Sequence, residues 1–255
     1  MEIRRLDREE INDALNLVRE VFLSDPDLIR SQEGISSFMS FVKGQGPGLC
    51  WLGAYDGDLC GALGYDEEYH IALFFVRKEK QKQGIGRGLL KVLCEEAEHA
   101  GYARISVNAA EKAKPVYEHL GFTAADDVQE KDGIRYIPME IFLQRKYLGK
   151  TVTVTVDRPY GSFHPTFADI RYLCNYGYVE EILASDGEFQ DAYVFGPEEA
   201  LESFTGTVIA VIIRRDDTES KWVVAKDTNY DRQAVIDAVG FQEQFFDIHI
   251  LWLEN

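Results

Sequence analysis

The sequence predicts an α+β protein of two domains: a mixed sheet with flanking helices over residues 1–145, and a small β-barrel with a C-terminal helix over residues 151–255. Three observations lead to this prediction. Helical and strand-like apolar periodicities alternate through the first half. An unbroken apolar run there is followed by a glycine-rich turn and a helix. After residue 150 the chain changes to short alternating strands separated by turn residues, a pattern typical of a small barrel.

The first 65 residues predict a strand, two helices and a hairpin. MEIRRL alternates like a short strand, and EEINDALNLVREVF repeats its apolar residues at helical spacing. A loop, SDPDLIRSQEG, leads to a shorter helix, ISSFMSFV, which ends at the glycines and proline of residues 44–48. LCWLGAYDGDLCGALGYD then predicts two strands, because Asp56–Gly57 is a strong two-residue turn signal.

The rest of the first half predicts three strands and two helices. HIALFFV is uninterrupted by polar residues, which indicates a strand buried on both faces. The next helix repeats Ile85, Leu89, Leu93 and Ala97 every four residues and ends at Gly101. RISVNA, KAKPVYEHLGF and IRYIPMEIFL predict a strand, a short helix and a last strand.

The second half follows a short connector, QRKYLGK, which places the domain boundary near residues 146–150. TVTVTV alternates strictly, and four more strands are expected around residues 177–183, 192–195, 207–213 and 221–225. A helix over residues 232–246 is expected to close this domain.

Composition narrows the class of protein. Hydrophobic residues make up 45% and charged residues 28% of the 255 residues, which is typical of a folded globular chain. The net charge of −17 disfavours nucleic acid and anionic membranes as partners, and it favours cationic small molecules or metal ions. No apolar stretch approaches the ~18 residues of a membrane span, so no membrane segment is expected.

The cysteines and the N-terminus bear on the compartment. Cys50, Cys60, Cys94 and Cys174 show neither a C-x-x-C pair nor zinc-ligand spacing, which predicts free, buried thiols in a reducing compartment. The N-terminus lacks the apolar region of a signal peptide. We therefore expect a cytoplasmic protein. Its oligomeric state is open, and a homo-oligomer is one of the alternatives.

The stretch QKQGIGRG predicts an anion-binding turn. It follows an apolar strand and opens a helix, which aims free backbone N–H groups and the positive end of the helix dipole at a ligand. A Walker loop does not fit, because no Lys-Ser or Lys-Thr follows the glycines. A dinucleotide fingerprint does not fit either, because its third glycine falls on Leu89. The positive charges around the turn are Arg77, Lys78, Lys80, Lys82, Arg87 and Lys91.

Gln81, Gly84 and Gly86 instead form Q-x-x-G-x-G, and in this the segment resembles the GNAT superfamily of N-acetyltransferases. A second stretch, VNAAEKAKPVYEHLGF, is similar to the superfamily's later strand and helix, with Tyr117 four residues before Gly121–Phe122. The order of elements also matches, so the resemblance covers residues 1 to about 145. A tight turn without a ligand is the alternative interpretation of the glycines.

The resemblance implies that acetyl-CoA binds along this strand and turn. Its pyrophosphate would accept hydrogen bonds from the N–H groups between Gln81 and Arg87, and its pantetheine arm would pair along Leu73 to Val76. A backbone N–H near Phe75 or Val76 would stabilise the oxyanion of the thioester. Asn108 would bond to the pantetheine arm or cap the following helix. The residues expected to contact acetyl-CoA are Phe75, Val76, Gln81, Lys82, Gly84, Ile85, Gly86, Arg87 and Asn108.

The resemblance also implies direct transfer of the acetyl group to a neutral amine. Tyr117 matches the superfamily's general acid, since a phenol with a pKa of ~10 is protonated at pH 7. Its alternative role is packing against the sheet. The general base is expected among Glu67, Glu68 and His70, and Glu68 is the residue predicted for this role. The alternative is that this run of charges is a solvated strand end, as charge runs often are. Acidic residues in two expected acceptor loops, 25–34 and 66–70, favour a small-molecule amine that is cationic or polyamine-like as the acceptor.

The second half contains a run of carboxylates, NYGYVEEILASDGEFQDAYV, that resembles soluble family I inorganic pyrophosphatases. Their OB-like barrel carries N-Y-G-Y followed by D-G-D-P-x-D. The resemblance implies Mg²⁺ or Mn²⁺ held by Asp186, Glu188 and Asp191, since hard cations prefer oxygen ligands. Two departures stand against it: Glu188 and Phe189 replace the middle aspartate and the proline, and an early-strand lysine has no counterpart. The alternative is a solvated hairpin.

Three function classes follow from these resemblances. The first is an N-acetyltransferase with an appended pyrophosphatase-like domain. The second is a metal-dependent phosphoanhydride hydrolase whose CoA-binding domain is regulatory. The third is an acetyl-CoA sensor without catalysis.

Overall fold

The computed structural model describes residues 1–25, 31–167 and 170–254. The chain divides into two compact units. The first consists of Met1–Ala97 with Arg104–Phe142, and the second of Glu98–Ala103 with Leu143–Asn255. Each of them is built around one sheet in the described ranges.

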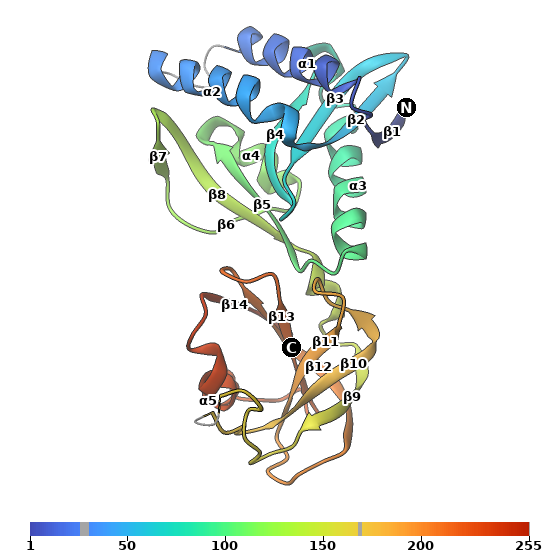
Figure 1. Cartoon of the computed structure of the whole chain (residues 1–255), viewed down its shortest axis with the longest axis vertical. Helices are drawn as coiled ribbons and strands as arrows, with labels where there is room; N and C mark the ends of the chain where they lie inside the picture. The colour runs from blue at the N-terminus through green and yellow to red at the C-terminus, as the bar shows by residue number, and fades with distance from the viewer. Residues whose placement is uncertain (26–30, 168–169, 255) are drawn as a thin grey trace. The chain divides into compact units, whose positions relative to one another are not determined.

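The first unit has a mixed sheet with the strand order β1-β2-β3-β4-β5-β8-β6, and β7 pairs with β8 (Figure 1). Its strands are β1 (Glu2–Arg5), β2 (Cys50–Asp56), β3 (Asp58–Tyr65), β4 (His70–Val76), β5 (Arg104–Ala110), β6 (Thr123–Ala124), β7 (Gln129–Lys131) and β8 (Ile134–Phe142). Among the strands of the described residues, β4 and β5 are the only parallel neighbours in this sheet. They share just two register pairs, His70 with Ser106 and Ile71 with Val107. Beyond these pairs the two strands separate, which opens the sheet at its centre.

Four α-helices accompany this sheet: α1 (Ile11–Ser24), α2 (Gln32–Gly44), α3 (Ile85–His99) and α4 (Lys114–His119). Short 3₁₀ turns, η1 (Gly46–Gly48), η2 (Lys78–Lys80) and η3 (Glu111–Ala113), connect elements. The apolar face of α1 packs on the sheet, with Leu15 and Val18 in one buried cluster with Trp51 and Leu73. Burying an aliphatic side chain contributes roughly 1.5–3 kcal/mol, so this cluster is a main source of stability for the unit.

Two predictions about local structure in this unit need correction. Helix α2 begins at Gln32, three residues before the predicted start, because the Ser31 side chain accepts a hydrogen bond from the Gly34 N–H and caps the helix. Strand β4 is not buried on both faces. Its residues Phe74, Phe75 and Val76 are only half-buried, because the sheet opens at this end of the strand.

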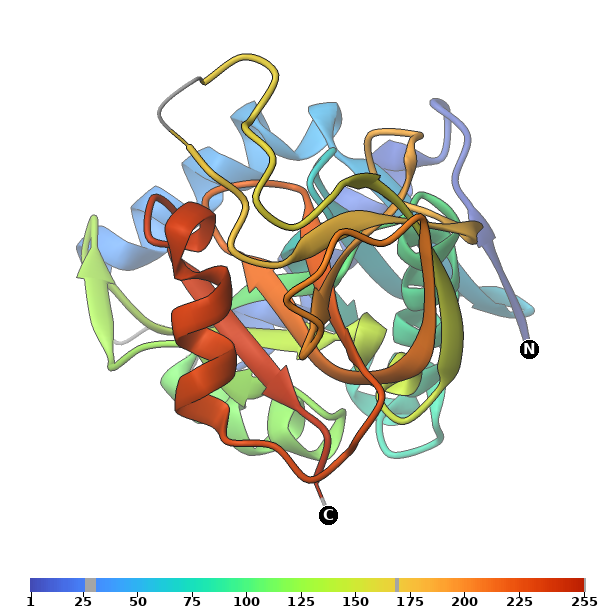
Figure 2. The same cartoon turned by 90° about the horizontal axis from the view of Figure 1, so that it is seen from below.

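The second unit is a closed barrel of five strands. Its strands are β9 (Thr151–Arg158), β10 (Asn175–Leu183), β11 (Phe189–Phe195), β12 (Ser203–Arg214) and β13 (Ser220–Ala225). The order β13-β11-β10-β9-β12 is closed by pairing of β12 with β13, and only β11 and β13 are parallel. A sixth strand, β14 (Ile248–Trp252), pairs with β12. Figure 2 shows the strands curving round, with α5 (Arg232–Glu243) beside β14. The 3₁₀ turn η4 (Leu143–Tyr147) precedes β9.

One buried cluster of the second unit combines aromatic and aliphatic side chains. Tyr172, Tyr176 and Tyr193 lie in one buried cluster with Ile212 and Val239. All five predicted strands and the helix are present, although the helix ends at Glu243 rather than near residue 246. Strand β14 was not predicted, because a five-residue run directly after a helix has too little alternation to be distinguished from the helix end.

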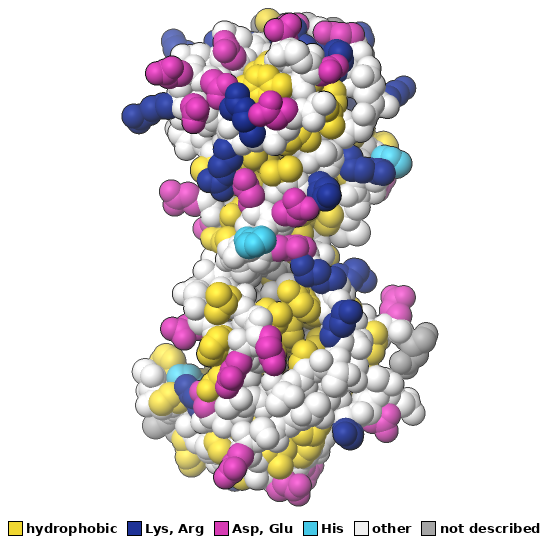
Figure 3. Space-filling model, turned by 90° about the vertical axis from the view of Figure 1, so that its right-hand side faces the viewer, with side chains coloured by type: hydrophobic (Ala, Val, Ile, Leu, Met, Phe, Trp, Pro, Cys, Tyr) yellow, Lys and Arg dark blue, Asp and Glu magenta, His cyan; other side chains and the backbone are white. Residues whose placement is uncertain are grey.

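The surface and the thiols are ordinary for a folded chain. Figure 3 shows positive and negative side chains interspersed on one face of the molecule. The four cysteines all lie in the described ranges and none forms a disulfide, as predicted, and Cys60 and Cys174 are buried. Cys50, however, is exposed, because it is the first residue of β2 and its side chain lies at the end of the sheet. No helix in the described ranges is long and apolar enough to cross a membrane.

Candidate active site

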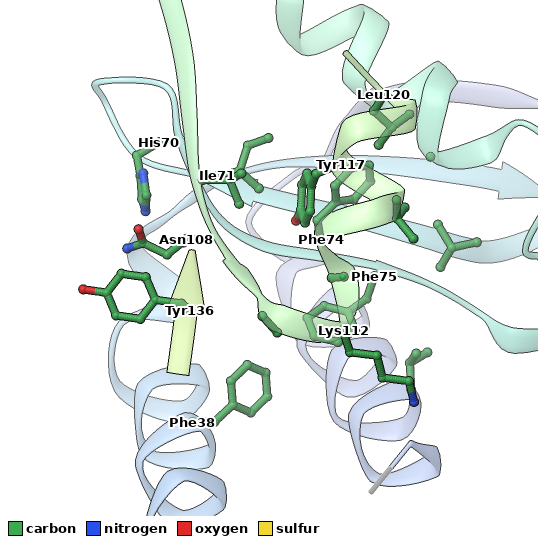
Figure 4. Close-up of a pocket in the computed structure, with 18 of the residues that line it drawn as sticks. Phe38, His70, Ile71, Phe74, Phe75, Asn108, Lys112, Tyr117, Leu120 and Tyr136 are labelled. Carbon is green, nitrogen blue, oxygen red and sulfur yellow. The ribbon is translucent and has the colours of Figure 1, made fainter. Parts of the chain in front are cut away.

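The opening between β4 and β5 is the bottom of a large cavity in the first unit. The cavity has a volume of about 1790 Å³ and is bordered by α2, β4, the turn before α3, β5, α4 and β8. A single small-molecule site usually has ~300–1,000 Å³. The cavity therefore has room for two substrates at once. Figure 4 shows the side chains that point into it.

The glycine-rich turn borders one end of this cavity, at the carboxyl end of β4. Gly84 has φ +84° and Lys82 has φ +61°, so the chain turns sharply before α3 begins at Ile85. Residues other than glycine rarely adopt such a φ, and placing one there destabilises the fold by roughly 1 kcal/mol or more. Strain of this kind is typical of ligand-binding turns.

The turn presents unpaired backbone donors. The Gly88 N–H donates to the Gly84 carbonyl, which makes Gly84 the first acceptor of α3. The N–H groups of Ile85, Gly86 and Arg87 therefore have no acceptor within the helix. Gln81 differs from its predicted role, because its N–H donates to Lys78 and its side-chain amide donates to the Val76 carbonyl at 3.1 Å. Its side chain ties the turn to β4, and the free donors begin after it.

The basic residues around the turn divide into two groups. Arg77 pairs with Glu20, and Lys80 pairs with Asp56 at 2.6 Å, so these two charges are used within the fold. Lys78 and Lys82 are exposed and have no salt-bridge partner in the part of the chain that the structure describes. Together with Arg87 they leave a net positive charge where the free N–H groups point, which suits a phosphate-bearing ligand. Arg87 Nη2 lies 3.1 Å from His119 Nε2 of α4.

Tyr117 lies on α4 across the opening from β4. Its ring makes edge contacts with Phe122 and Phe74, with centroids 5.3 and 6.3 Å apart. Figure 4 shows its hydroxyl directed into the cavity. Burial raises the pKa of the phenol above its ordinary value of 10, so the hydroxyl keeps its proton at neutral pH. The ring is packed and the hydroxyl is available, so the two interpretations of Tyr117 are compatible.

The candidate bases lie at the opposite end of β4. Glu68 is exposed, and its N–H donates to Asp66 Oδ1. His70 is half-buried, and its Nδ1 lies 2.9 Å from Ser106 Oγ. Burial lowers the pKa of His70 below 6.5, with the charge of Arg104 acting in the same direction and the carboxylates of Asp66 and Glu68 opposing it. The ring is neutral at pH 7 and can accept a proton.

The remaining predicted contact residues also lie around the cavity. Asn108 is on β5, opposite Pro138 of β8, and Figure 4 shows its amide beside His70. Phe75 and Val76 are on β4 and pair on one side with Ala62 and Gly61 of β3. Their other backbone edge faces the opening. The structure thus brings the predicted residues of the first unit to one cavity, with Glu68 at its rim.

Comparison with known proteins assigns this fold. Residues 31–143 match the family model described as an acetyltransferase (GNAT) domain. Residues 31–143 therefore form a GNAT domain. The match covers less than half of the chain, so it describes the first unit and not the whole protein. No curated protein matches the chain.

Solved structures similar to this chain include other GNAT proteins. A GCN5-related N-acetyltransferase from Rhodopseudomonas palustris is 15% identical, with a TM-score of 0.47 over 55% of this chain and 94% of that one. The PaiA N-acetyltransferase from Thermoplasma acidophilum, determined with coenzyme A, is 20% identical, with a TM-score of 0.45 over 55% and 98%. A GNAT acetyltransferase from Staphylococcus aureus Mu50 is 15% identical, with a TM-score of 0.44 over 56% and 98%. At these values the GNAT assignment depends on the family model.

The acidic stretch of the second unit is a hairpin between β10 and β11. Asp186 Oδ1 accepts a hydrogen bond from the Glu188 N–H at 3.0 Å, and Gly187 has φ +84°, so Asp186 stabilises the turn. Asp191 forms an ion pair with Lys221 of β13. Glu188 is exposed. Within residues 1–25, 31–167 and 170–254, no group of three or more His, Cys, Asp or Glu side chains is placed to hold a metal ion.

Two of the residues predicted as metal ligands, Asp186 and Asp191, instead contact other groups of the chain. Lys221 is 3% exposed and lies between Asp191 and Glu219, with its Nζ 2.5 Å from Glu219 Oε2. The ammonium supplies the positive charge that a cation would otherwise bring to these carboxylates. Next to it, Arg214 makes two hydrogen bonds to the buried Glu243, at 2.9 and 2.6 Å. The His164 ring in the loop before β10 accepts hydrogen bonds at Nδ1 from the N–H groups of Thr166 and Phe167 within its own turn.

The sequence interpretation missed part of the cavity wall. Phe38 and Phe41 of α2, Ile134 and Tyr136 of β8 all border it. The available signal was the spacing of Phe38 and Phe41, three residues apart, which places them on one face of the helix. Of the two predicted acceptor loops, 66–70 lies at the rim of the cavity, and residues 26–30 of the other lie outside the described ranges.

Proposed function

We propose that the protein is an N-acetyltransferase that moves an acetyl group from acetyl-CoA directly to a small-molecule amine. The observation that carries the proposal is the open β4–β5 cavity, which joins the donors of the glycine turn to Tyr117 and to His70. The GNAT domain supports it.

We further propose a domain boundary near residues 146–150 and a cytoplasmic location, where acetyl-CoA is available.

The residues of the turn fit acetyl-CoA as a substrate. The N–H groups of Ile85, Gly86 and Arg87 would bind its pyrophosphate, with Lys82 nearby. The unpaired edge of β4 at Phe75 and Val76 would bind its pantetheine arm as an added strand. Acetyl-CoA supplies an acyl group activated as a thioester. A free N–H on this edge would stabilise negative charge on the acyl oxygen.

Tyr117 is proposed as the proton donor to the leaving thiolate. The same apolar surroundings that raise the pKa of the phenol also raise the proton affinity of a thiolate formed beside it, which keeps the transfer balanced. His70 is proposed as the acceptor of the amine proton, with Glu68 the alternative at the rim. His70 is the better placed of the two because it is half-buried in the cavity and held by Ser106.

The test is steady-state kinetics with acetyl-CoA and a panel of amines, with CoA quantified by chromatography because the exposed Cys50 would react with thiol reagents. Tyr117→Phe should lower kcat by about 10²–10⁴-fold and leave the Kd of CoA within about threefold. Tyr55→Phe is the control, because it removes a hydroxyl that lies outside the cavity and donates to Glu10. Wild-type protein that binds acetyl-CoA but acetylates no amine would identify it as a sensor instead.

His70→Asn and Glu68→Gln separate the two bases. Because the pKa of His70 is lowered by burial, the ring is protonated only below pH 6.5, and activity that needs the neutral ring falls as the pH drops through that lower pKa. Wild-type kcat/KM should therefore have an acidic limb below pH 6.5. His70→Asn should remove this limb along with most of the activity. If Glu68→Gln does so and His70→Asn does not, the assignment is reversed.

For the second unit we propose an OB-like barrel without an assigned reaction. The strand order and the single parallel pair of β11 with β13 support this fold. The pyrophosphatase-like interpretation has only the two sequence motifs in its favour, and the ion pair of Asp191 with Lys221 stands against a hydrolytic metal centre.

A further inference from the structure

The two halves of the cavity differ in chemistry. At the carboxyl end of β4 it is bordered by the glycine turn, Lys78, Lys82 and Arg87, which suit an anionic substrate. At the other side it is bordered by α2, the amino end of β4 and β8. This second half is hereafter the acceptor half, and it bears on the identity of the amine.

Helix α2 gives the acceptor half an apolar wall. Only Gly34 and Val42 of its 13 residues are buried, and Phe41 is 37% exposed. A helix on the surface of a globular protein normally packs its large apolar side chains into the core. Here Phe38 packs against the core and also borders the cavity, together with Ser37 and Phe41. An apolar helix face left open toward a cavity is what a binding site for an apolar group requires.

The aromatic side chains of this wall are fixed in place. Phe38 stacks on Phe22 with centroids 4.1 Å apart and lies 6.0 Å from Phe75. The Tyr136 hydroxyl donates to Gln129 Oε1 at 3.0 Å, which holds its ring beside the cavity. In Figure 4 Phe38 and Tyr136 lie on the same side as Asn108 and His70. Rings held by neighbours provide contact area without a further loss of conformational entropy on binding.

The charges at the rim favour a cation. Asp66, Glu67 and Glu68 precede β4 at this end. Lys112, one of the two lysines near this half, is paired with Asp25 at 2.8 Å. The other, Lys131, is exposed and is followed by Asp132. A rim with an excess of carboxylates raises the local concentration of ammonium-bearing molecules.

From this arrangement we infer that the acceptor is a primary amine on an apolar body about the size of one aromatic ring. The inference rests on the proposed acetyltransferase function. The amine would lie toward His70 and the opening of the sheet, and the ring would lie against Phe38, Phe75 and Tyr136. A polyamine or an amino sugar would place polar groups against this wall without partners, which is unfavourable.

The test compares phenethylamine with putrescine and glucosamine as acceptors. Phenethylamine should have the highest kcat/KM by about tenfold or more. Phe38→Ala should raise the KM for phenethylamine roughly tenfold and leave the KM for acetyl-CoA unchanged. Met39→Ala, on the same helix but away from the cavity, is the matched control and should change neither constant by more than about twofold.

The outcomes separate this inference from the function beneath it. Acetylation of putrescine or glucosamine in preference to phenethylamine, or a Phe38→Ala variant with unchanged KM, overturns the inference and leaves the acetyltransferase proposal intact. If the protein binds acetyl-CoA but acetylates none of the three amines, binding of the amines is measured by thermal shift. Stabilisation by phenethylamine but not by putrescine would support the wall as its binding site even then, and the absence of that difference would overturn the inference.

Discussion

Lys221 holds the acidic face of the barrel together. Its side chain is 3% exposed, whereas its partners Asp191 and Glu219 are 32% and 30% exposed. Removal of the lysine leaves two carboxylates that water can still reach. Removal of both carboxylates leaves a buried ammonium ion without a partner, which is much less favourable. The two changes should therefore differ in effect, and the carboxylate change also breaks the ion pair of Glu219 with the buried Arg214.

We predict that Asp191→Asn/Glu219→Gln lowers the free energy of unfolding of the second unit by about 3–5 kcal/mol, and that Lys221→Met lowers it by about 1–2 kcal/mol. Hydrogen exchange of amides in β12 and β13 reports on this unit alone. Equal losses, or a larger loss for Lys221→Met, would contradict the view that Lys221 is the buried charge of the group.

The same residues show what a local motif can and cannot predict. The spacing of Asp186 and Asp191 matched a metal-binding motif, and the structure places the two carboxylates in and after a hairpin turn. Their partners were not predictable. Lys221 meets Asp191 only because β11 and β13 pair in parallel, and a pairing between strands separated by 24 residues leaves no local signal.

At the scale of elements, the close pairing of β9 and β10 depends on Gly177. A Cβ atom at this position would lie 1.9 Å from the Thr155 carbonyl oxygen, which is backbone and cannot move aside. The strands are irregular here, with a register shift between Tyr176 and Gly177. Gly240 of α5 is the opposite case, since a Cβ atom there has nothing within 4 Å.

Gly177→Ala is therefore expected to destabilise the barrel by about 2–4 kcal/mol, because the two strands must separate to accept the methyl group. Gly240→Ala should stabilise it by up to about 1 kcal/mol, since alanine is favoured over glycine inside a helix. Urea denaturation of both variants beside wild type provides the comparison. A neutral Gly177→Ala would mean that the strand pair is looser than the described contacts indicate.

Elements were predictable where the local pattern was long or carried strong turn signals. The Asp56–Gly57 hairpin, α1 and α3 are of this kind. Strand β4 was found, but its burial was not, because an apolar run is compatible both with a sheet interior and with the wall of a cavity. The half-buried residues Phe74 to Val76 are apolar because they form part of the wall of the cavity. The position of the cavity therefore needed the pairing of β4 with β5, which is a property of the whole sheet.

At the scale of the whole molecule, the two units carry their chemistry separately. Every residue that borders the candidate active site belongs to the first unit. The family model ends at residue 143, so the second unit has no assignment from it. The question that the sequence raises about the second unit is whether its carboxylates form another active site. Their contacts lead us to expect that they do not, because Asp186 stabilises its turn and Asp191 is neutralised by Lys221.

We predict that the full-length protein releases no phosphate from pyrophosphate in the presence of Mg²⁺ or Mn²⁺, and that millimolar Mg²⁺ or Mn²⁺ does not raise its Tm. A metal bound at a concentration 100 times its Kd would stabilise the fold by ~2.7 kcal/mol, which a thermal scan detects readily. Asp186→Ala should behave like wild type in both assays, and binding of acetyl-CoA in the same preparation shows that the protein is folded. Metal-dependent release that Asp186→Ala abolishes would show that the carboxylates exchange Lys221 for metal ions in solution, and the protein would then have two active sites.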